Sequence, residues 1–271
     1  MGGERSRSAA AALAVSVLVG AAAATPAAAG DRLDARFEIF GFAGLHVLTD
    51  QTSAEERPGG YAIATNLNTR GLASAFVDLR SHSEVYGKLA DDKPRPEAYR
   101  AEISRNGADR TFGLKYLGDG DVVDTAPAAS KEAAYLEGVK SRGTVDQLTA
   151  YFLVERQLAR RGSCQLTVPV FDGNELYRLR FSDLKDETLK ADSHQSFSGP
   201  AHVCEVVREM VVANPDKKEG TYDRGRLWYA RLLPADRVVP VRMVYETPFG
   251  NVDGYLAEVS GYGVHLKFMD Q

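Results

Sequence analysis

The sequence lacks the motifs that would indicate a common enzyme chemistry. It has two cysteines among 271 residues, and it contains no GxSxG, GxGxxG, P-loop or HExxH motif. These absences exclude nucleophile-elbow hydrolases, dinucleotide-binding enzymes, P-loop nucleotidases and zincins. The histidines are scattered, and we interpret each as a surface or structural residue: His46, His82, His194, His202 and His265. We therefore expect a protein that is not an enzyme and that holds no cofactor or metal.

The sequence also has no large excess of one charge. Its 33 basic and 37 acidic residues give a net charge of −4, and no run of five like charges occurs. A nucleic-acid partner or an anionic membrane surface would call for a basic patch, so neither is expected. Gly118–Asp121 with Asp124 superficially suggests a calcium loop. It lacks the D-x-D-x-D-G spacing and the distal glutamate, so it predicts an acidic turn.

Only one long apolar run is present, and it lies near the start of the chain. Arg5 and Arg7 precede the alanine-rich stretch Ala9–Ala24, which ends in small residues before Ala29 and Gly30. A basic head, an apolar middle and a small-x-small site predict a secretory signal peptide cleaved between Ala29 and Gly30. The run is shorter than the roughly 20 apolar residues that span a bilayer, although an uncleaved anchor is the alternative.

The expected product of that cleavage is a soluble periplasmic protein of one domain, residues 30–271. Bacterial lipid attachment needs a cysteine at the new N-terminus, and position 30 is glycine. The sequence therefore predicts an exported protein that is not a lipoprotein and has no transmembrane anchor.

Export changes how the two cysteines are interpreted. Thiols in an oxidising compartment tend to pair, so we predict a disulfide between Cys164 and Cys204. A bridge closing such a loop stabilises a fold by roughly 4 kcal/mol in the chain-entropy model. A metal pair or a catalytic thiol is the alternative. Of the other candidate metal ligands, only His202 lies at a ligand-like spacing from either cysteine.

The dominant periodicity of the sequence is two, which predicts strands with one buried face. Asn106-Gly107 and Asp172-Gly173 are hairpin signals because these residues tolerate positive φ. Pro169 and Pro240 fall inside strand-like runs and are expected at edges or bulges. The predicted strands are 61–68, 99–104, 112–116, 166–171, 176–181, 203–210, 226–231, 238–247 and 252–259.

One segment has helical spacing instead. Thr144–Arg161 begins with Asp146 as a candidate N-cap, or with Thr144 and Gln147 at capping-box spacing, and Gly162 follows as the C-cap. Weaker helices are expected at 72–79 and 131–138, and loops at 88–96, 118–129 and 213–221. The predicted fold class is α+β and β-dominant, with a highly curved antiparallel sheet wrapped over a few helices.

The order of these features resembles a known group. The helix start VDQLTAYF, the segment VFDGNELYRLRF after Cys164, the second Cys204, and Leu227-Trp228-Tyr229 are its main marks. Over about residues 37–259 the chain resembles the exported bacterial family called domain of unknown function 3108. The resemblance implies an unclosed β-barrel like that of periplasmic lipoprotein carriers, with an apolar cavity for acyl chains. It implies no catalytic residue.

Aromatic residues on the predicted strands suggest where a ligand could bind. They can fill the core, or they can line an apolar pocket between sheet and helix that admits a lipid or another hydrophobic molecule. The candidates are Tyr177, Phe181, Trp228, Tyr245 and Phe249. The runner-up function is an envelope interaction protein that binds a protein partner through its sheet edges. A cofactor-free enzyme using groups such as His202 and Glu205 comes third.

Overall fold

A single antiparallel sheet of 15 strands makes up most of the described chain. The computed structural model describes residues 31–41, 44–75, 77–91, 93–126, 141–194, 196–212, 224–234, 237–247 and 250–269. The predicted signal peptide with its cleavage site at Ala29 and Gly30 lies outside these residues. So do the helix expected at 131–138, the loop expected at 213–221, and Phe249.

The first half of the sheet is a meander of long strands. Its elements are β1 (Asp31–Phe40), β2 (His46–Arg57), β3 (Gly60–Thr69), the 3₁₀ helix η2 (Gly71–Ala75), β4 (Leu79–Ala90), β5 (Lys93–Arg105), β6 (Ala108–Tyr116) and β7 (Val122–Asp124).

The second half begins with the helix α1 (Gln147–Arg161) and returns to strands. These are β8 (Leu166–Phe171), β9 (Leu176–Asp183), β10 (Glu187–Leu189), β11 (Gly199–Val212), β12 (Arg224–Leu233), β13 (Arg237–Thr247), β14 (Gly250–Gly261) and β15 (Val264–Lys267).

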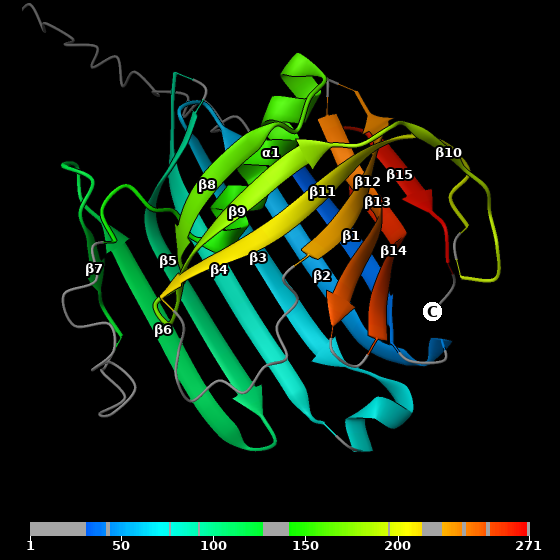
Figure 1. Ribbon diagram of the computed structural model, residues 1–271, viewed down its shortest axis with the longest axis horizontal. Coiled ribbons are helices and arrows are strands. Elements are labelled where there is room, and N and C mark those ends of the chain that lie inside the picture. The colour runs from blue at the N-terminus through cyan, green and yellow to red at the C-terminus, as the bar shows by residue number, and fades with distance from the viewer. Residues whose placement is uncertain are drawn as a thin grey trace, which may run out of the picture.

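The two halves join where β1 pairs with β14. The spatial order is β7-β6-β5-β4-β3-β2-β1-β14-β13-β12-β11-β9-β8, with β10 on β11 and β15 on β14. Figure 1 shows the sheet curling around α1, with β8, β9 and β11 crossing in front of the helix and β3 to β5 passing behind it. The end strands β7 and β8 do not pair with each other, so the sheet is not closed. The predicted β-dominant, curved and unclosed fold is confirmed.

Helix α1 forms where the sequence predicts it. The Asp146 side chain accepts a hydrogen bond from the Thr149 N–H, which makes Asp146 the N-cap. Gly162 ends the helix in the left-handed conformation at φ 68°, and its N–H donates to the Leu158 carbonyl. A residue with a side chain is strained at that φ, so glycine is the expected C-cap.

The helix is buried between two apolar clusters. One face carries Phe152 into a cluster with residues of β3 to β6, including Tyr61 and Leu114. Another face carries Val154 into a cluster with β8, β9, β11 and β12. A third cluster, which contains Trp228, is built from β1 and from β10 to β14 and includes no helical residue. The helix therefore fills the space under the curled sheet beside the first two clusters.

Three local predictions were wrong, and each has a physical reason. The loop expected at 118–129 includes the short strand β7, because Val122–Asp124 pair with the end of β6. The helix expected at 72–79 is the short η2, and β4 already begins at Leu79. The loop expected at 88–96 is strand on both sides of a tight turn at Asp91, which has φ 51°. Pro94 and Pro96 are tolerated there because β6 pairs with β5 only from Ala98 onward, so this part of β5 has a free edge.

Three other turn and proline predictions are confirmed. Asn106 and Gly107 both have positive φ, 53° and 79°, in the β5–β6 hairpin. Pro169 lies on β8, which ends the sheet. Pro240 lies at a register shift between β12 and β13, where a bulge removes the need for its missing N–H.

Candidate functional site

A cavity of about 470 Å³ lies at the C-terminal end of α1. Its walls come from the last turn of α1, the link between β9 and β10, the start of β11 with the residues before it, the second half of β12 and the start of β13. The lining residues are Leu158, Gly162, Asp186, Phe197, Ser198, Gly199, Pro200, Ala201, His202, Tyr229, Ala230, Arg231, Leu232 and Val238.

Most of the wall is apolar and well ordered by packing. Leu158, Phe197, Ala201 and Tyr229 are all buried members of the apolar clusters. Val238 is partly buried and packs against the cluster that includes Leu158. Cavities that bind small molecules have volumes of roughly 300–1,000 Å³ and mostly apolar walls with a few polar groups. The size and lining of this cavity suit a hydrophobic ligand.

One side-chain hydrogen bond and one glycine help to shape the cavity. Arg231 of β12 donates from Nη2 to the carbonyl of Ala159 at 2.8 Å, which joins the strand to the last turn of α1. A cation at this position also complements the negative end of the helix dipole. On the opposite wall, a Cβ on Gly199 would lie 3.1 Å from Phe197 Cζ. Glycine therefore lets the Phe197 ring close over the chain.

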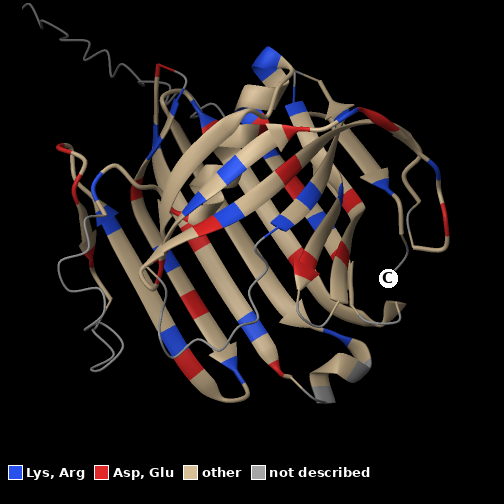
Figure 2. Cartoon of the chain, viewed as in Figure 1, with Lys and Arg blue, Asp and Glu red and all other residues tan. Residues whose placement is uncertain are grey.

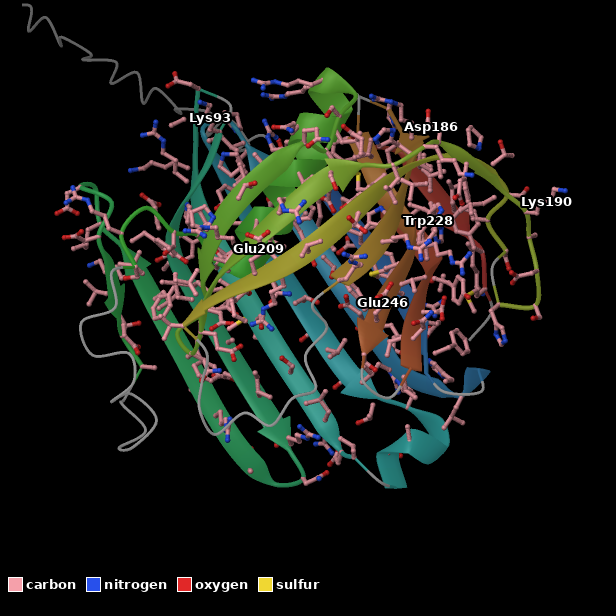
Figure 3. The ribbon with its side chains drawn as sticks, viewed as in Figure 1. Lys93, Asp186, Lys190, Glu209, Trp228 and Glu246 are labelled. Atoms are coloured by element: carbon pink, nitrogen blue, oxygen red, sulfur yellow. A yellow bond between two sulfur atoms is a disulfide. The ribbon has the colours of Figure 1, made fainter. Side chains whose placement is uncertain are left out.

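The polar rim of the cavity is centred on His202. Its Nε2 lies 2.8 Å from Asp183 Oδ1, and its Nδ1 lies 2.7 Å from Asp186 Oδ1. His202 and Asp183 are partly buried, whereas Asp186 is exposed. Figure 3 shows Asp186 where the chain passes from β9 to β10.

Asp183 links this rim to the disulfide. Its carboxylate accepts the Cys164 N–H at 2.7 Å and the Ser163 hydroxyl at 2.6 Å. Burial raises the pKa of Asp183, but these hydrogen bonds and the nearby His202 outweigh it and leave the pKa below its ordinary value. Cys164 and Cys204 form the predicted disulfide, with Cα atoms 6.2 Å apart, and both are fully buried.

Three of the predicted aromatic residues lie together, against α1. Tyr177 and Phe181 are 2% and 1% exposed. Phe181 meets the Tyr151 ring edge to face, and the hydroxyls of Tyr151 and Tyr245 are 3.2 Å apart. These contacts place the three predicted residues in the packed layer between helix and sheet.

Trp228 lies elsewhere, in the cluster without helical residues. Its Nε1 donates to Glu187 Oε2 at 2.9 Å, and the Arg242 guanidinium lies 4.9 Å from its ring centre. None of the four described aromatic candidates lines the 470 Å³ cavity, although Tyr229 and Ala230, which follow Trp228, do. The segment 197–201 was missed because it has no periodicity and joins Tyr229 and Ala230 at the cavity only through folding.

Other charged candidates are dispersed. Glu205 lies three residues from His202 on one strand, so the two side chains leave opposite faces. Glu205 instead lies 3.6 Å from Arg224, and Glu84 lies 3.7 Å from His82. Burial raises the pKa of Glu155 on α1 to about 8, an effect that Arg237 partly opposes. These carboxylates do not form an acid–base pair with the rim of the cavity.

A second cavity, of about 440 Å³, has a different character. It lies on β3 to β6 and is lined mostly by charged, amide and hydroxyl side chains, among them Asn66, His82, Glu102 and Thr111. Figure 2 shows acidic and basic residues mixed over these strands without a patch of one sign. The polar lining makes it a poor site for an apolar ligand.

Comparison with known proteins places the chain in a family. The family model described as "Protein of unknown function (DUF3108)" matches residues 36–257. The chain belongs to the DUF3108 family. No curated protein sequence matches this DUF3108 chain.

Two solved structures resemble the DUF3108 chain at low identity. One is a β-barrel-like protein of domain of unknown function DUF1849 from Brucella abortus, with 13% identity and a TM-score of 0.48. That match covers 86% of this chain and 98% of the other. The second is described as a "putative lipoprotein" from Parabacteroides distasonis, with 10% identity, a TM-score of 0.31, and coverage of 85% and 95%.

Two further observations complete the site of this DUF3108 protein. Among the described residues, Cys164, His202 and Cys204 form one group whose potential metal-ligand atoms all lie within 4.8 Å of one another. In the disulfide neither sulfur is a thiolate, which is the form that binds metals.

Within the described part of the chain, no helix has the length and apolar character needed to cross a membrane.

Proposed function

We propose that this DUF3108 protein binds a hydrophobic small molecule or a lipid chain in the cavity at the end of α1. The observation that supports the proposal is the cavity itself, with about 470 Å³ of space and walls that include leucine, phenylalanine, alanine and valine beside a few polar residues. Burying an apolar ligand there contributes about 25 cal/mol per Å² of apolar surface removed from water.

The rim supports an amphiphilic ligand in particular. His202, Asp186 and Arg231 all lie on the cavity wall, so a polar end group could meet either charge there. The arrangement favours binding over catalysis, because both ring nitrogens of His202 are already held by carboxylates. We therefore propose a binding protein and no enzymatic activity.

The edge of the sheet at β8 gives less support to the runner-up function. Val145, just before α1, donates its N–H to the Pro169 carbonyl of β8, and its own carbonyl accepts from Phe171. These bonds occupy part of the outer edge of β8, where a partner strand would pair. Ligand binding in the cavity is therefore the better-supported proposal.

We further propose that the protein works in the periplasm as a soluble, cleaved chain. The leader and the disulfide support export, and glycine at position 30 argues against lipid attachment. Intact-mass measurement of protein recovered from a periplasmic extract tests this directly. A mass that corresponds to a chain beginning at Gly30 supports the proposal. A mass that corresponds to the uncleaved chain, or to a chain with an attached lipid, contradicts it.

A cavity-filling variant tests ligand binding. Val238→Phe adds volume inside the cavity, whereas the control Val123→Phe adds it on the exposed strand β7. The probe is dansylated undecanoic acid, which emits strongly only in an apolar site. Trp228, the single tryptophan, adjoins the cavity residue Tyr229 and can transfer excitation to bound dansyl.

We expect saturable binding by the wild type and by Val123→Phe, and at least tenfold weaker binding by Val238→Phe. Native mass spectrometry of protein from periplasmic extracts then identifies any co-purified lipid. Equal affinity of both variants for the probe would place the ligand elsewhere. Absence of saturable binding together with ligand-free native spectra would overturn the proposal.

A further inference from the structure

We propose that the reduced protein binds one zinc ion through Cys164, Cys204 and His202, with the Asp183 carboxylate as the fourth ligand. The disulfide and the zinc complex would then be two alternative states of the same site. This inference does not depend on ligand binding in the cavity.

The ligands are already gathered in the folded protein. The two sulfurs and a ring nitrogen of His202 lie within 4.8 Å of one another. Asp183 Oδ1 lies 3.1 Å from Cys164 Sγ and 2.8 Å from His202 Nε2. His202 and Cys204 are two residues apart on β11, so both side chains leave the same face of that strand. Only small side-chain movements are needed to bring four donors around one ion.

The donor types favour zinc. Zinc is bound tetrahedrally by thiolate sulfur, imidazole nitrogen and carboxylate oxygen at distances of about 2.0–2.3 Å. The second nitrogen of His202 also has the partner that zinc ligands usually have. Its Nδ1 faces Asp186 Oδ1 at 2.7 Å, which would orient the ring with Nε2 toward the metal. Cys164 and Cys204 are fully buried, so the metal would be held in a site of low polarity.

The chemistry balances with a phosphine as the reductant. The phosphine takes an oxygen atom from water and becomes a phosphine oxide, and the disulfide takes up two electrons and two protons to give two thiols. Zinc then displaces the two thiol protons and forms two zinc–sulfur bonds. Reoxidation needs a disulfide oxidant, which removes two electrons from the thiolates and releases the metal.

The test uses the full chain in both redox states. The protein is reduced with a water-soluble phosphine in denaturant, freed of reductant without oxygen, and refolded with or without one equivalent of Zn²⁺ or Co²⁺. We expect the reduced protein to bind one Co²⁺ with an intense thiolate-to-cobalt absorption band, and Zn²⁺ to displace it. The oxidised protein should show no such band.

Variants separate this site from adventitious binding. His202→Ala should weaken zinc binding by the reduced protein at least about tenfold, and Asp186→Asn by about tenfold, since the first is a ligand and the second orients it. His265→Ala is the matched control, because His265 is exposed on β15 and pairs only with Glu258 among the described contacts. It should bind zinc as the wild type does.

Each outcome decides the proposal. The reduced chain can also require zinc in order to fold. In that case, recovery of the near-UV circular dichroism signal with one equivalent of zinc supports the proposal. Three results overturn it: reduced protein that binds no stoichiometric zinc, oxidised protein that binds equally well, or unchanged affinity in His202→Ala.

Discussion

Asp146 is an N-cap that lies inside the protein. Its carboxylate accepts the Thr149 N–H at 2.8 Å and the Thr149 hydroxyl at 2.7 Å, and that hydroxyl also meets the Tyr61 hydroxyl. A helix N-terminus ordinarily favours the charged form of a carboxyl group. Here burial dominates and raises the pKa of Asp146 to about 6, despite the hydrogen bonds from Thr149. Folding therefore strengthens proton binding at this residue.

That shift predicts a pH dependence of stability. The unfolded pKa is about 3.9, so between about pH 4 and pH 6 the folded state holds more protons than the unfolded state. The free energy of unfolding then falls as the pH rises through this window. Relative to Asp146→Asn, which cannot titrate, the wild type should lose about 2–3 kcal/mol between pH 4 and pH 7. Urea unfolding at a series of pH values measures this, and a difference independent of pH would contradict it.

Glu175 and Arg208 form a buried ion pair. Arg208 Nη2 donates to Glu175 Oε2 at 2.6 Å, with the two side chains 6% and 3% exposed. Removing one member of a buried pair leaves the charge of the other less well compensated and costs about 3–5 kcal/mol. We expect Glu175→Gln to lower the free energy of unfolding in urea by about 3 kcal/mol.

Glu209 provides the matched control. It pairs with Arg180 at 3.0 Å, but the side chains of Glu209 and Arg180 are 43% and 47% exposed, and Glu209 is labelled on β11 in Figure 3. Glu209→Gln should change stability by no more than about 1 kcal/mol. Equal losses in the two variants would show that burial does not decide the strength of these pairs.

Among the elements, β4 and β5 depend on a close backbone contact. A Cβ on Gly87 would lie 2.2 Å from the Arg95 carbonyl oxygen and 2.7 Å from Pro96 Cα. Gly87 pairs with Pro96 at a register shift that begins after Tyr86. The bulge and the glycine together let a strand containing two prolines stay paired.

Gly87→Ala should therefore destabilise the protein by about 3 kcal/mol or more, because the atoms it meets are backbone and cannot turn aside. Gly118→Ala is the control: nothing lies within 4 Å of its added Cβ. We expect Gly118→Ala to stay within about 0.5 kcal/mol of the wild type. Thermal unfolding by far-UV circular dichroism compares the two, and similar midpoints would refute the steric argument.

Local signals predicted α1 well because its caps are local. Asp146 and Gly162 act on their own helix, so the sequence alone shows where it ends and limits its N-cap to Thr144 or Asp146. The strand β2 was missed because its inward face carries polar residues. Asp50 hydrogen-bonds Thr65 across the sheet, and Glu56 pairs with Arg156 of α1 and with Arg237 of β13. These partners are distant in sequence, so no local pattern reveals that the residues face inward.

At the scale of the whole molecule, the curled sheet followed from the number of strands, but the cavity did not. An antiparallel sheet this large must curl, and strand periodicity shows that. The cavity instead depends on residues 197–201, β12 and the end of α1 coming together in the folded protein. The aromatic residues predicted to line a cavity are apolar, as such a cavity wall requires. Tyr177 and Phe181 are instead packed against the helix. Long-range placement decides between a packed wall and an open one.

The disulfide holds this end of the molecule together. It joins the segment after α1 to β11 across a sequence separation of 40 residues. Linking two points so far apart removes loop entropy from the unfolded chain, worth about 4 kcal/mol. We expect Cys164→Ala with Cys204→Ala to lower the free energy of unfolding in urea by about that amount, and a loss below about 1 kcal/mol would contradict the entropic argument. The same variant has no cysteine left, so we expect zinc not to stabilise it. If zinc partly restores the stability of the reduced wild type but not of this variant, both roles belong to these two sulfurs.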